Sequence, residues 1–563
     1  MDKRFFLFLI LAAAVLVVTP LLFPPSPVQA PGSAADSTHA QTAESARATP
    51  APSPTQGAAP AAQAPATAPA SLSAAAPETV TVRTAKSVYR FSTVGAMPVA
   101  VTLPDYKSLA RGDGQVELAR PGTPLLEYTL LRGPGDTLRL DRTAFAVDSS
   151  ALASPTAPAL TFRATVEGVN VAIAYTFAPD SYVVRVRGTV EGAGTGTHYL
   201  LTTLPNGLRS EEADTAADQH QLAYVVKPVR GDPKSIGFGK LDTTEARAET
   251  GPFTWLASKN KYFVVGLLTD TTGTPFGGAV FHGRPRTGKI ATSASATIIQ
   301  PIGTNGQFAF EMYTGPQEWR RLLAIGRDFD HVNPYGGFFQ GIVQPFATIV
   351  MRILLWIHER LPINYGWILI IFGIAVRLIL WPLNQGAMRS SLKMQRLQPE
   401  LQALQKKYKS QPEKQHAEMM RLYKEHGMSP LSPMMGCLPM LIPMPVLFAL
   451  FFVFQNTIEF RGVSFLWLPD ISLKDPYYIL PILMGLSMYV LSWIGLRSAP
   501  QNQQAKMMAY MMPVMMTVFF LNLASGLNLY YAVQNFAALP QQWLIARERA
   551  KVGSTPVVRT TTG

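Results

Sequence analysis

A single arginine inside a long apolar segment is the residue whose type and position most clearly suggest a chemical role in this sequence. Arg377 lies within WILIIFGIAVRLILWPLN, residues 367–384, which is otherwise almost wholly apolar. An arginine at the centre of a bilayer costs about 2.5–3.5 kcal/mol even on translocon-insertion scales. No acidic residue lies in any of the five long apolar segments of this part of the chain, 363–383, 434–456, 477–496, 507–523 and 527–545. An unpaired cation in such a place predicts a hydrated cavity that receives a negative or strongly polar guest.

Snorkelling of the guanidinium to the membrane surface is the alternative interpretation of Arg377. The residue lies only five positions before Pro382, which is roughly 7–8 Å along a helix. Helical side chains, however, lean toward the N-terminus of their helix. That lean favours a guanidinium that lies deeper in the membrane and needs water or polar partners there.

Polar side chains gather in the last two apolar segments, 507–523 and 527–545, and in the turn between them, and supply such partners. Taken singly, each is better explained by hydrogen bonding between neighbouring helices than by function. Together with a buried cation they predict a polar groove among the helices. The residues are Asn522, Ser525, Asn528, Tyr530, Tyr531, Gln534 and Asn535.

Other reactive residue types form no pattern typical of catalysis or metal binding. His198, His220 and His282 lie in no metal-ligand or nucleophile spacing, so we interpret them as structural or solvated. Cys437 is the only cysteine, which excludes an intramolecular disulfide, and its apolar surroundings favour a buried side chain. We therefore expect no metal, no cofactor and no enzymatic chemistry.

Composition and charge favour a membrane protein. Apolar residues make up 48% of the 563 residues and charged residues only 15%, against about 25% in soluble proteins. From Arg320 onward there are 23 Lys/Arg and 11 Asp/Glu. Because these basic residues lie between apolar segments, they indicate membrane topology rather than recognition of a nucleic-acid sequence.

The chain begins with an expected membrane anchor and tether. Residues 1–23 place Lys3 and Arg4 before a long apolar run, which favours an uncleaved signal anchor, although VQA at 28–30 leaves cleavage open. Residues 24–77 are rich in Ala and Pro and predict a disordered linker on the periplasmic side.

Residues 78–317 show a period of two that is typical of half-buried antiparallel strands. In VAIAYTF the apolar positions alternate with small or polar ones, and YVVRVRGTV and QFAFEMY repeat the pattern. We predict an all-β periplasmic sandwich. Its expected core residues include Val171, Ile173, Tyr175, Phe177, Tyr182, Val184, Val186, Phe308, Phe310 and Met312.

The remaining chain predicts helices in and on a membrane. Residues 318–362 are expected to form connecting and interfacial amphipathic helices, and 363–545 a core of five spans. With the anchor this gives a polytopic protein of six transmembrane helices. The proposed inner segments, including the basic tail 546–563, hold 17 Lys/Arg against 2 in the outer loop 457–476. Both termini should therefore be cytoplasmic.

The inner segment 384–433 is itself expected to be structured. Leu397, Leu401, Leu404 and Tyr408 recur at steps of four and three, like one seam of a coiled coil. SQPE at 410–413 offers a turn and a start for a second helix. The pattern predicts a basic helical hairpin in the cytoplasm.

Several long motifs resemble those of the YidC membrane protein insertases. The resemblance is dense over 320–550, and the anchor and β domain are similar to those of relatives from double-membraned bacteria. The motifs are AVRLILWPL, MQRLQPELQALQKKY, PLSPMMGCLPMLIPMPVLFALF, LPDISLKDPYYILPILMG and SGLNLYYAVQN.

This resemblance implies an insertase that moves newly made proteins into the bacterial inner membrane without consuming a nucleotide. The implied groove is open to the cytoplasm and the lipid. Implied partners are nascent membrane proteins, the ribosome, the Sec translocon, signal-recognition components and the phospholipid bilayer. The hairpin resembles the family's recruiting element, and its candidate basic residues are Lys393, Arg396, Lys406, Lys407 and Lys409.

The resemblance also assigns groove residues. Arg377 matches the family's groove arginine and Tyr531 a tyrosine that contacts substrate in relatives. The chain departs from the family at Pro443, where many relatives have a glutamine, at Asn522 (a tryptophan) and at Gly373 (a threonine). The full expected groove is Arg377, Tyr531, Gly373, Asn522, Asn528, Tyr530 and Gln534.

Two other function classes stay open at this point. A secondary transporter for a small anionic solute would also use a buried cation, but it would need internal repeats, and none is evident. An enzyme on the β domain would need a carboxylate pair or an activated nucleophile, and neither stands out.

Overall fold

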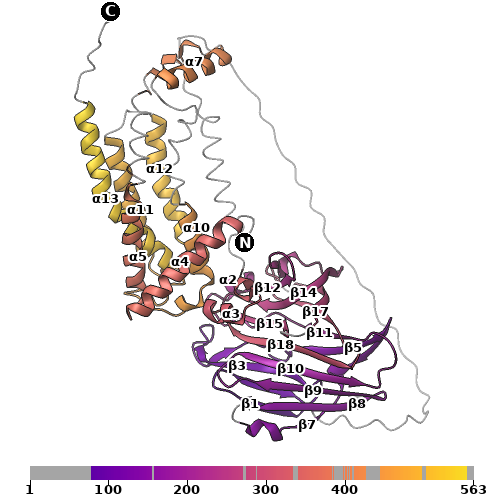
Figure 1. Ribbon diagram of the computed structural model, residues 1–563. Helices are drawn as coiled ribbons and strands as arrows, with labels where there is room; N and C mark the ends of the chain where they lie inside the picture. Colours follow the sequence, from indigo (N-terminus) through magenta and orange to yellow (C-terminus); the bar gives the residue numbers. More distant parts are fainter. Residues whose placement is uncertain are drawn as a thin grey trace, which may run out of the picture. The chain divides into compact units, whose positions relative to one another are not determined.

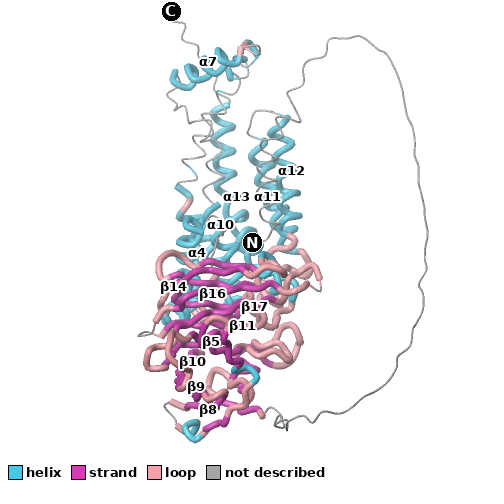
Figure 2. The backbone as a smooth tube through the Cα atoms, turned by 90° about the vertical axis from the view of Figure 1, so that its right-hand side faces the viewer, coloured by secondary structure: helices cyan, strands magenta, loops and turns pink. Residues whose placement is uncertain are grey.

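The computed structural model describes residues 78–333 apart from 155–156, 271–273 and 287, and then 340–382, 444–497 and 503–553, with parts of 385–425. Predictions for 1–77, for Cys437 and Pro443, and for Lys393, Arg396 and Lys409 lie outside the described residues. Strands fill the N-terminal part of the described chain and helices the C-terminal part (Figure 2).

The β domain contains two antiparallel sheets. The smaller consists of β1 (Thr79–Arg83), β2 (Val88–Ser92), β3 (Met97–Lys107) and β4 (Gln115–Glu117), in that order. The larger has 14 strands in the order β6-β5-β11-β17-β16-β14-β15-β18-β10-β9-β8-β7, with β12 and β13 joined through β14. Its strands are β5 (Glu127–Gly133), β6 (Asp136–Arg139), β7 (Ala146–Asp148), β8 (Ala159–Val166), β9 (Val169–Phe177), β10 (Val183–Glu191), β11 (Tyr199–Leu204), β12 (Ala223–Pro228), β13 (Lys234–Gly237), β14 (Arg247–Lys259), β15 (Phe263–Thr269), β16 (Phe276–Gly283), β17 (Ala294–Pro301) and β18 (Gln307–Pro316).

The two halves of the larger sheet face each other across one core. Tyr128 on β5 and Tyr175 on β9 come from strands far apart in the sheet order, yet their hydroxyl oxygens lie 2.9 Å apart. Tyr89 and Phe91 from the smaller sheet are also fully buried in the same core. The predicted all-β domain is therefore confirmed.

Alternation in the sequence correctly identified the buried faces of the strands. On β9 the side chains of Val171, Ile173, Tyr175 and Phe177 are buried, while the positions between them are less so. The buried rows of neighbouring strands also include Tyr182, Val184, Val186, Phe308, Phe310 and Met312. Pleating sends successive side chains to opposite faces, so a period of two fixes which residues enter the core.

The described helical region contains one helix of 29 residues, α13 (Ser525–Gly553), and several shorter helices (Figure 1). α11 packs against both α12 and α13, and α13 also packs against α5. The helices are α2 (Thr215–His220) in the β domain, α3 (Trp319–Ile325), α4 (Gln340–Arg360), α5 (Tyr365–Ile379), α7 (Pro412–Glu425), α10 (Met444–Asn456), α11 (Ile479–Arg497), α12 (Gln503–Phe520) and α13 (Ser525–Gly553).

Among the described residues, one helix is long and apolar enough to cross a membrane, over Ile479–Leu496. Tyr365–Ile379, Val446–Asn456 and Ala509–Phe520 are shorter apolar helices. A C-terminal helical region is thus confirmed, whereas the expectation of six transmembrane helices stays a prediction.

α4 carries apolar side chains on two faces. Ala347 and Leu354 are fully buried where the helix packs against α10. Ile349 and Trp356, by contrast, are 53% and 57% exposed. The exposed apolar face fits the predicted placement of this helix along a membrane surface.

Candidate functional site

Arg377 lies in the last turn of α5, and its guanidinium reaches α13. Its Nη2 donates to Oε1 of Gln541 at 2.7 Å, and Nε2 of Gln541 donates to the carbonyl of Trp381 at 3.3 Å. Gln541 thus links the guanidinium to the backbone at the C-terminal end of α5. The direction in which the Arg377 side chain leans along the helix stays a prediction.

The guanidinium is only partly satisfied. Nε of Arg377 is buried and has no hydrogen-bond partner among the described residues. The ion pairs found in the described part of the chain give Arg377 no carboxylate partner. A neutral amide from Gln541 stabilises a cation less than a carboxylate would. The positive charge is thus held in place but not neutralised.

A cavity of about 590 Å³ opens beside Arg377 between helices α5, α10, α11 and α13. Amide, hydroxyl and phenol groups on α11 and α13 provide its polar wall. Such a mixed lining offers hydrogen bonds inside an otherwise apolar bundle. The lining residues are Val376, Arg377, Leu380, Val446, Leu491, Ser492, Gly495, Tyr530, Tyr531, Gln534, Asn535, Ala538 and Gln542.

Hydrogen bonds within the bundle fix the polar wall of this cavity. Nε2 of Gln534 donates to the carbonyl of Gly373 at 2.8 Å and to the hydroxyl of Tyr530 at 3.1 Å. On the opposite side, Nδ2 of Asn535 donates to Oγ of Ser487 at 3.1 Å. The side chains of α13 are therefore anchored to both α5 and α11, which preorganises the site.

The structure brings together four of the expected groove residues, namely Arg377, Tyr530, Tyr531 and Gln534. The other three do not line the cavity. A Cβ on Gly373 would lie 3.1 Å from Val533, so this glycine marks the close approach of α5 and α13.

Asn522 and Asn528 belong to the hairpin between α12 and α13. Asn522 is exposed in the four-residue turn between the helices. Asn528 is fully buried, and its Nδ2 donates to the carbonyl of Phe520 at 3.1 Å. That carbonyl is at the end of α12 and also accepts from the amide of Leu523 at 3.2 Å. Asn528 thus links the start of α13 to the end of α12.

Sequence reasoning missed Gln541, the direct partner of Arg377, and Gln542 in the cavity wall. Gln541 follows Gln534 by seven residues, which places both on one face of α13 after two turns. That spacing was the signal that could have identified it.

Comparisons with known proteins cover both parts of the chain. A family model described as "YidC periplasmic domain" matches residues 79–349, and one described as "60Kd inner membrane protein" matches 356–552. A protein of Chloroherpeton thalassium named membrane protein insertase YidC is 31% identical over 68% of this chain and 67% of its own length. The chain belongs to the YidC family.

Other relatives bear the same name at similar identity. The YidC of Chlorobaculum tepidum is 33% identical over 66% of this chain and 65% of its own length. The chain thus spans about two thirds of the length of the curated YidC proteins that it matches. A solved structure described as an active YidC insertase shares 20% identity over 85% of this chain, with a TM-score of 0.32.

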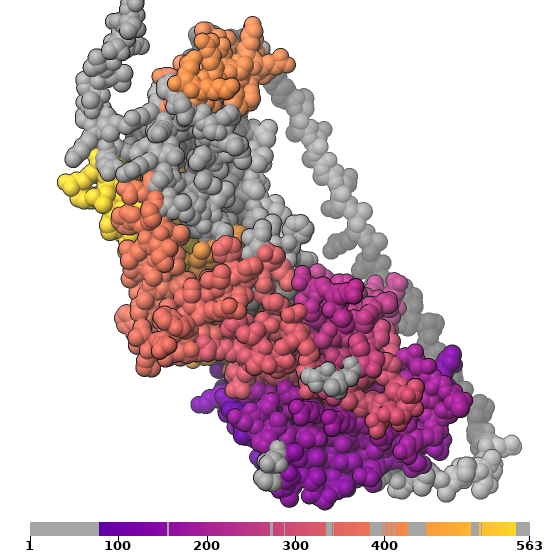
Figure 3. All heavy atoms as spheres, viewed as in Figure 1, coloured from indigo at the N-terminus to yellow at the C-terminus, as the bar shows by residue number. Residues whose placement is uncertain are grey.

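In the present chain, the segment between α5 and α10 is described in part. α7 has exposed charged residues, and the face of it that Figure 3 shows is open. Leu397 is buried and Tyr408 half-buried, whereas Lys406 and Lys407 are exposed. Two of the candidate recruiting lysines are thus available to a partner.

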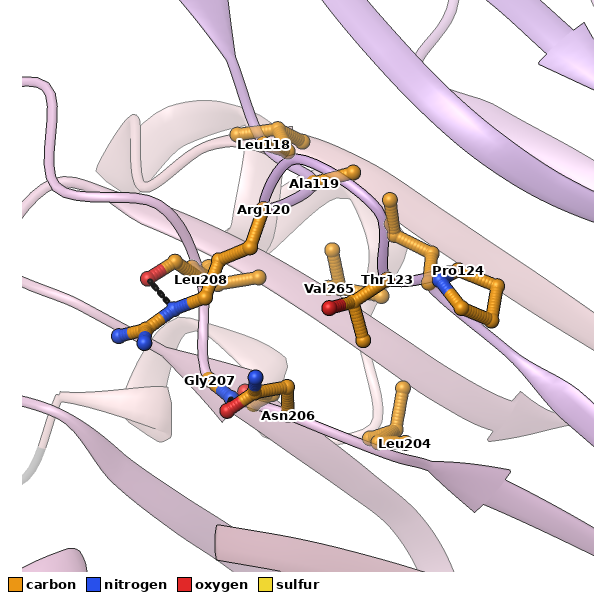
Figure 4. Close-up of a pocket in the computed structure, with 12 residues that line it drawn as sticks. Leu118, Ala119, Arg120, Thr123, Pro124, Leu204, Asn206, Gly207, Leu208 and Val265 are labelled. Carbon is orange, nitrogen blue, oxygen red and sulfur yellow. Dashed lines mark hydrogen bonds between the residues drawn. The ribbon is translucent and has the colours of Figure 1, made fainter. Parts of the chain in front are cut away.

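The β domain of this YidC relative has a small cavity of about 10 Å³ beside Arg120, Thr123 and Asn206 (Figure 4). Nε of Arg120 donates to the carbonyl of Leu208 at 3.4 Å. A space of this size holds about one water molecule and no sugar-sized ligand. Across the described residues, no group of three or more His, Cys, Asp or Glu is placed to hold a metal.

Both ring nitrogens of His198 lie 3.2 Å from backbone carbonyl oxygens, those of Arg132 and Gly194. His220 and His282 are exposed. These placements fit the structural and solvated interpretation made from the sequence.

Proposed function

We propose that this chain is a membrane protein insertase and chaperone of the bacterial inner membrane. The observation that carries the proposal is an unneutralised arginine beside a polar-walled cavity of about 590 Å³ within apolar helices. The relatives' shared name, membrane protein insertase YidC, supports the same function.

In this proposal the cavity is a groove open to the cytoplasm and the lipid. The polar, often acidic, exported segment of a client enters it and meets Arg377, while the apolar segment stays in contact with lipid. At a distance of ~4 Å and an effective dielectric near 20, a carboxylate and a guanidinium attract by about 4 kcal/mol before desolvation costs. This attraction offsets part of the free energy needed to bring a carboxylate into the membrane.

The cavity walls have complementary roles. Tyr530, Tyr531 and Gln534 offer hydrogen bonds to the client backbone as it leaves water, which limits the cost of unpaired polar groups. Gly373 allows α13 to pack closely on α5, and Asn522 and Asn528 serve the hairpin that positions α13. None of these steps consumes a nucleotide or needs a cofactor.

Clients would reach the groove from the cytoplasmic hairpin 384–433. We assign recruitment of ribosomes, signal-recognition components or nascent chains to Lys393, Arg396, Lys406, Lys407 and Lys409. The exposure of Lys406 and Lys407 supports this role. Cooperation with the Sec translocon belongs to the same proposal.

The proposed topology has six spans, with both termini and 384–433 in the cytoplasm and with 78–317 and 457–476 in the periplasm. A cysteine introduced by Lys407→Cys should then react with a membrane-impermeant maleimide only after the inner face of the membrane is exposed. Labelling in intact spheroplasts would contradict this topology. The single native residue Cys437 is first replaced by serine so that it does not contribute.

Insertion by purified chain in liposomes tests the function directly. A small membrane protein with an acidic exported tail should become protected from protease only when the chain is present. Uptake of a small anionic solute without insertion would instead favour the secondary transporter.

A further inference from the structure

The loop between α10 and α11, residues 457–476, satisfies the first backbone amides of α13. The amide of Ser525 donates to the carbonyl of Leu473 at 2.6 Å, and the amide of Gly526 donates to that of Ile471 at 2.8 Å. The first amides of a helix have no partners within the helix. The loop therefore determines where α13 begins.

The same loop also holds the start of α5. Nδ2 of Asn364 donates to the carbonyl of Ser464 at 2.8 Å, while Oδ1 of Asn364 accepts from the amide of Gly366. A Cβ on Gly366 would lie 2.2 Å from the ring of Phe465, so the loop packs directly on the helix backbone. α5 and α13 are the helices that carry Arg377 and its cavity wall.

One arginine of this loop is buried in the β domain. Nε of Arg461 donates to both carboxylate oxygens of Glu212, at 2.8 and 3.0 Å. Its Nη2 donates to the carbonyls of Lys107 and Glu211 at 2.9 and 3.2 Å, and its guanidinium carbon lies 5.4 Å from the ring centre of Phe263. The side chains of Arg461 and Glu212 are only 6% and 5% exposed.

A buried ion pair such as Arg461–Glu212 contributes more to positioning the loop than to the free energy of unfolding. Removing two charges from water offsets most of their attraction, whereas removing one partner strands the other charge. The guanidinium of Arg461 contacts a carboxylate, two carbonyls and an aromatic ring, and it can make all of these contacts in only one position. Arg461 thus sets the position of the loop on the β domain.

We infer that the β domain acts as a brace for the groove: Arg461 docks loop 457–476 on Glu212, and the docked loop fixes the starts of α5 and α13. The interaction surface consists of Glu212, the carbonyls of Lys107 and Glu211, and Phe263. This role does not depend on the proposed insertase activity.

A double-mutant cycle with hydrogen exchange on the full chain in detergent tests the brace. Arg461→Met and Glu212→Gln should each speed exchange in the first turns of α5 and α13 by about tenfold, while the β strands stay protected. Because both changes break one contact, the double variant should exchange no faster than the more affected single variant. Glu212→Gln removes the charge but keeps the side-chain volume, so it disturbs the folding of the β domain less than Arg461→Met.

An exposed ion pair of the same domain gives the control. Arg247 and Glu249 lie on the surface of β14, with side chains 46% and 20% exposed. Arg247→Met should leave exchange in α5 and α13 unchanged. Unchanged exchange at these helices in Arg461→Met, or strictly additive effects of the two changes, would overturn the inference.

Discussion

Arg377→Ala should abolish most insertion of a client with an acidic exported tail, while Arg377→Lys should retain a substantial part of it. The reason is that a point charge in the cavity suffices to attract a carboxylate. A loss of even half of the ~4 kcal/mol attraction would slow passage about thirtyfold. A version of the same client with a neutral tail should lose much less. The measurement is the rate of insertion of both versions into liposomes.

The hydrogen bond between Arg377 and Gln541 provides a control that separates a structural role of Arg377 from an electrostatic one. Arg377 bridges α5 and α13 through Gln541, so a purely structural role would be shared by both residues. Gln541→Met removes the bridge and keeps the charge. We expect it to preserve the difference between acidic and neutral tails. Equal losses for both tails in Arg377→Ala, matched by Gln541→Met and by a fall in thermal stability, would reject the electrostatic role.

A sequence shows that a cation lies in an apolar segment, but it does not show which residue binds that cation. Composition alone singled out Arg377, since burying a guanidinium is costly in any fold. Its hydrogen-bond partner is Gln541, which is 164 residues away in sequence and is brought near by the packing of α5 on α13. A rule for isolated helices cannot include that partner.

The polar residues of the last hairpin show a second limit. Sequence reasoning placed Asn528 with Tyr530 and Gln534 in one groove because all are polar residues in apolar surroundings. In the structure Asn528 instead donates to the carbonyl of Phe520, which also accepts from the amide of Leu523, and its buried side chain does not line the cavity. A polar side chain near a helix end can bond either to backbone groups at that end or to a neighbouring site, and a sequence does not show which of the two it does.

Local patterns in the β domain predicted which residues are buried, but not which strands meet. Alternation placed Tyr175 in the core correctly. Its contact with Tyr128 depends on the order of 14 strands, and the contact of Arg461 with Glu212 spans 249 residues. Contacts of this kind arise from long-range topology, which a period of two does not encode.

Glu459→Gln should stabilise the chain by an amount that grows as the pH rises from about 4.5 to about 7. Glu459 lies in the outer loop, and its Oε2 is buried without a hydrogen-bond partner among the described residues. Burial, the largest cause, raises the pKa of this carboxyl from 4.5 to about 7, and Glu318 adds to the effect. Between these two values the folded chain holds a proton that the unfolded chain has lost. Folding stability therefore falls as the pH rises through this window.

The size of the effect follows from the shift in the pKa of Glu459. A shift of one pKa unit corresponds to about 1.4 kcal/mol. The difference in folding stability between Glu459→Gln and the wild type therefore approaches about 3 kcal/mol above pH 7, and screening by solvent reduces it. Glutamine keeps the shape of the side chain and has no charge to bury. Thermal unfolding of both proteins in detergent, from about pH 5 to about pH 8, measures the growing difference. A constant offset between wild type and Glu459→Gln at every pH would mean that the folded chain does not hold this proton, because a raised pKa must appear as a change in stability with pH.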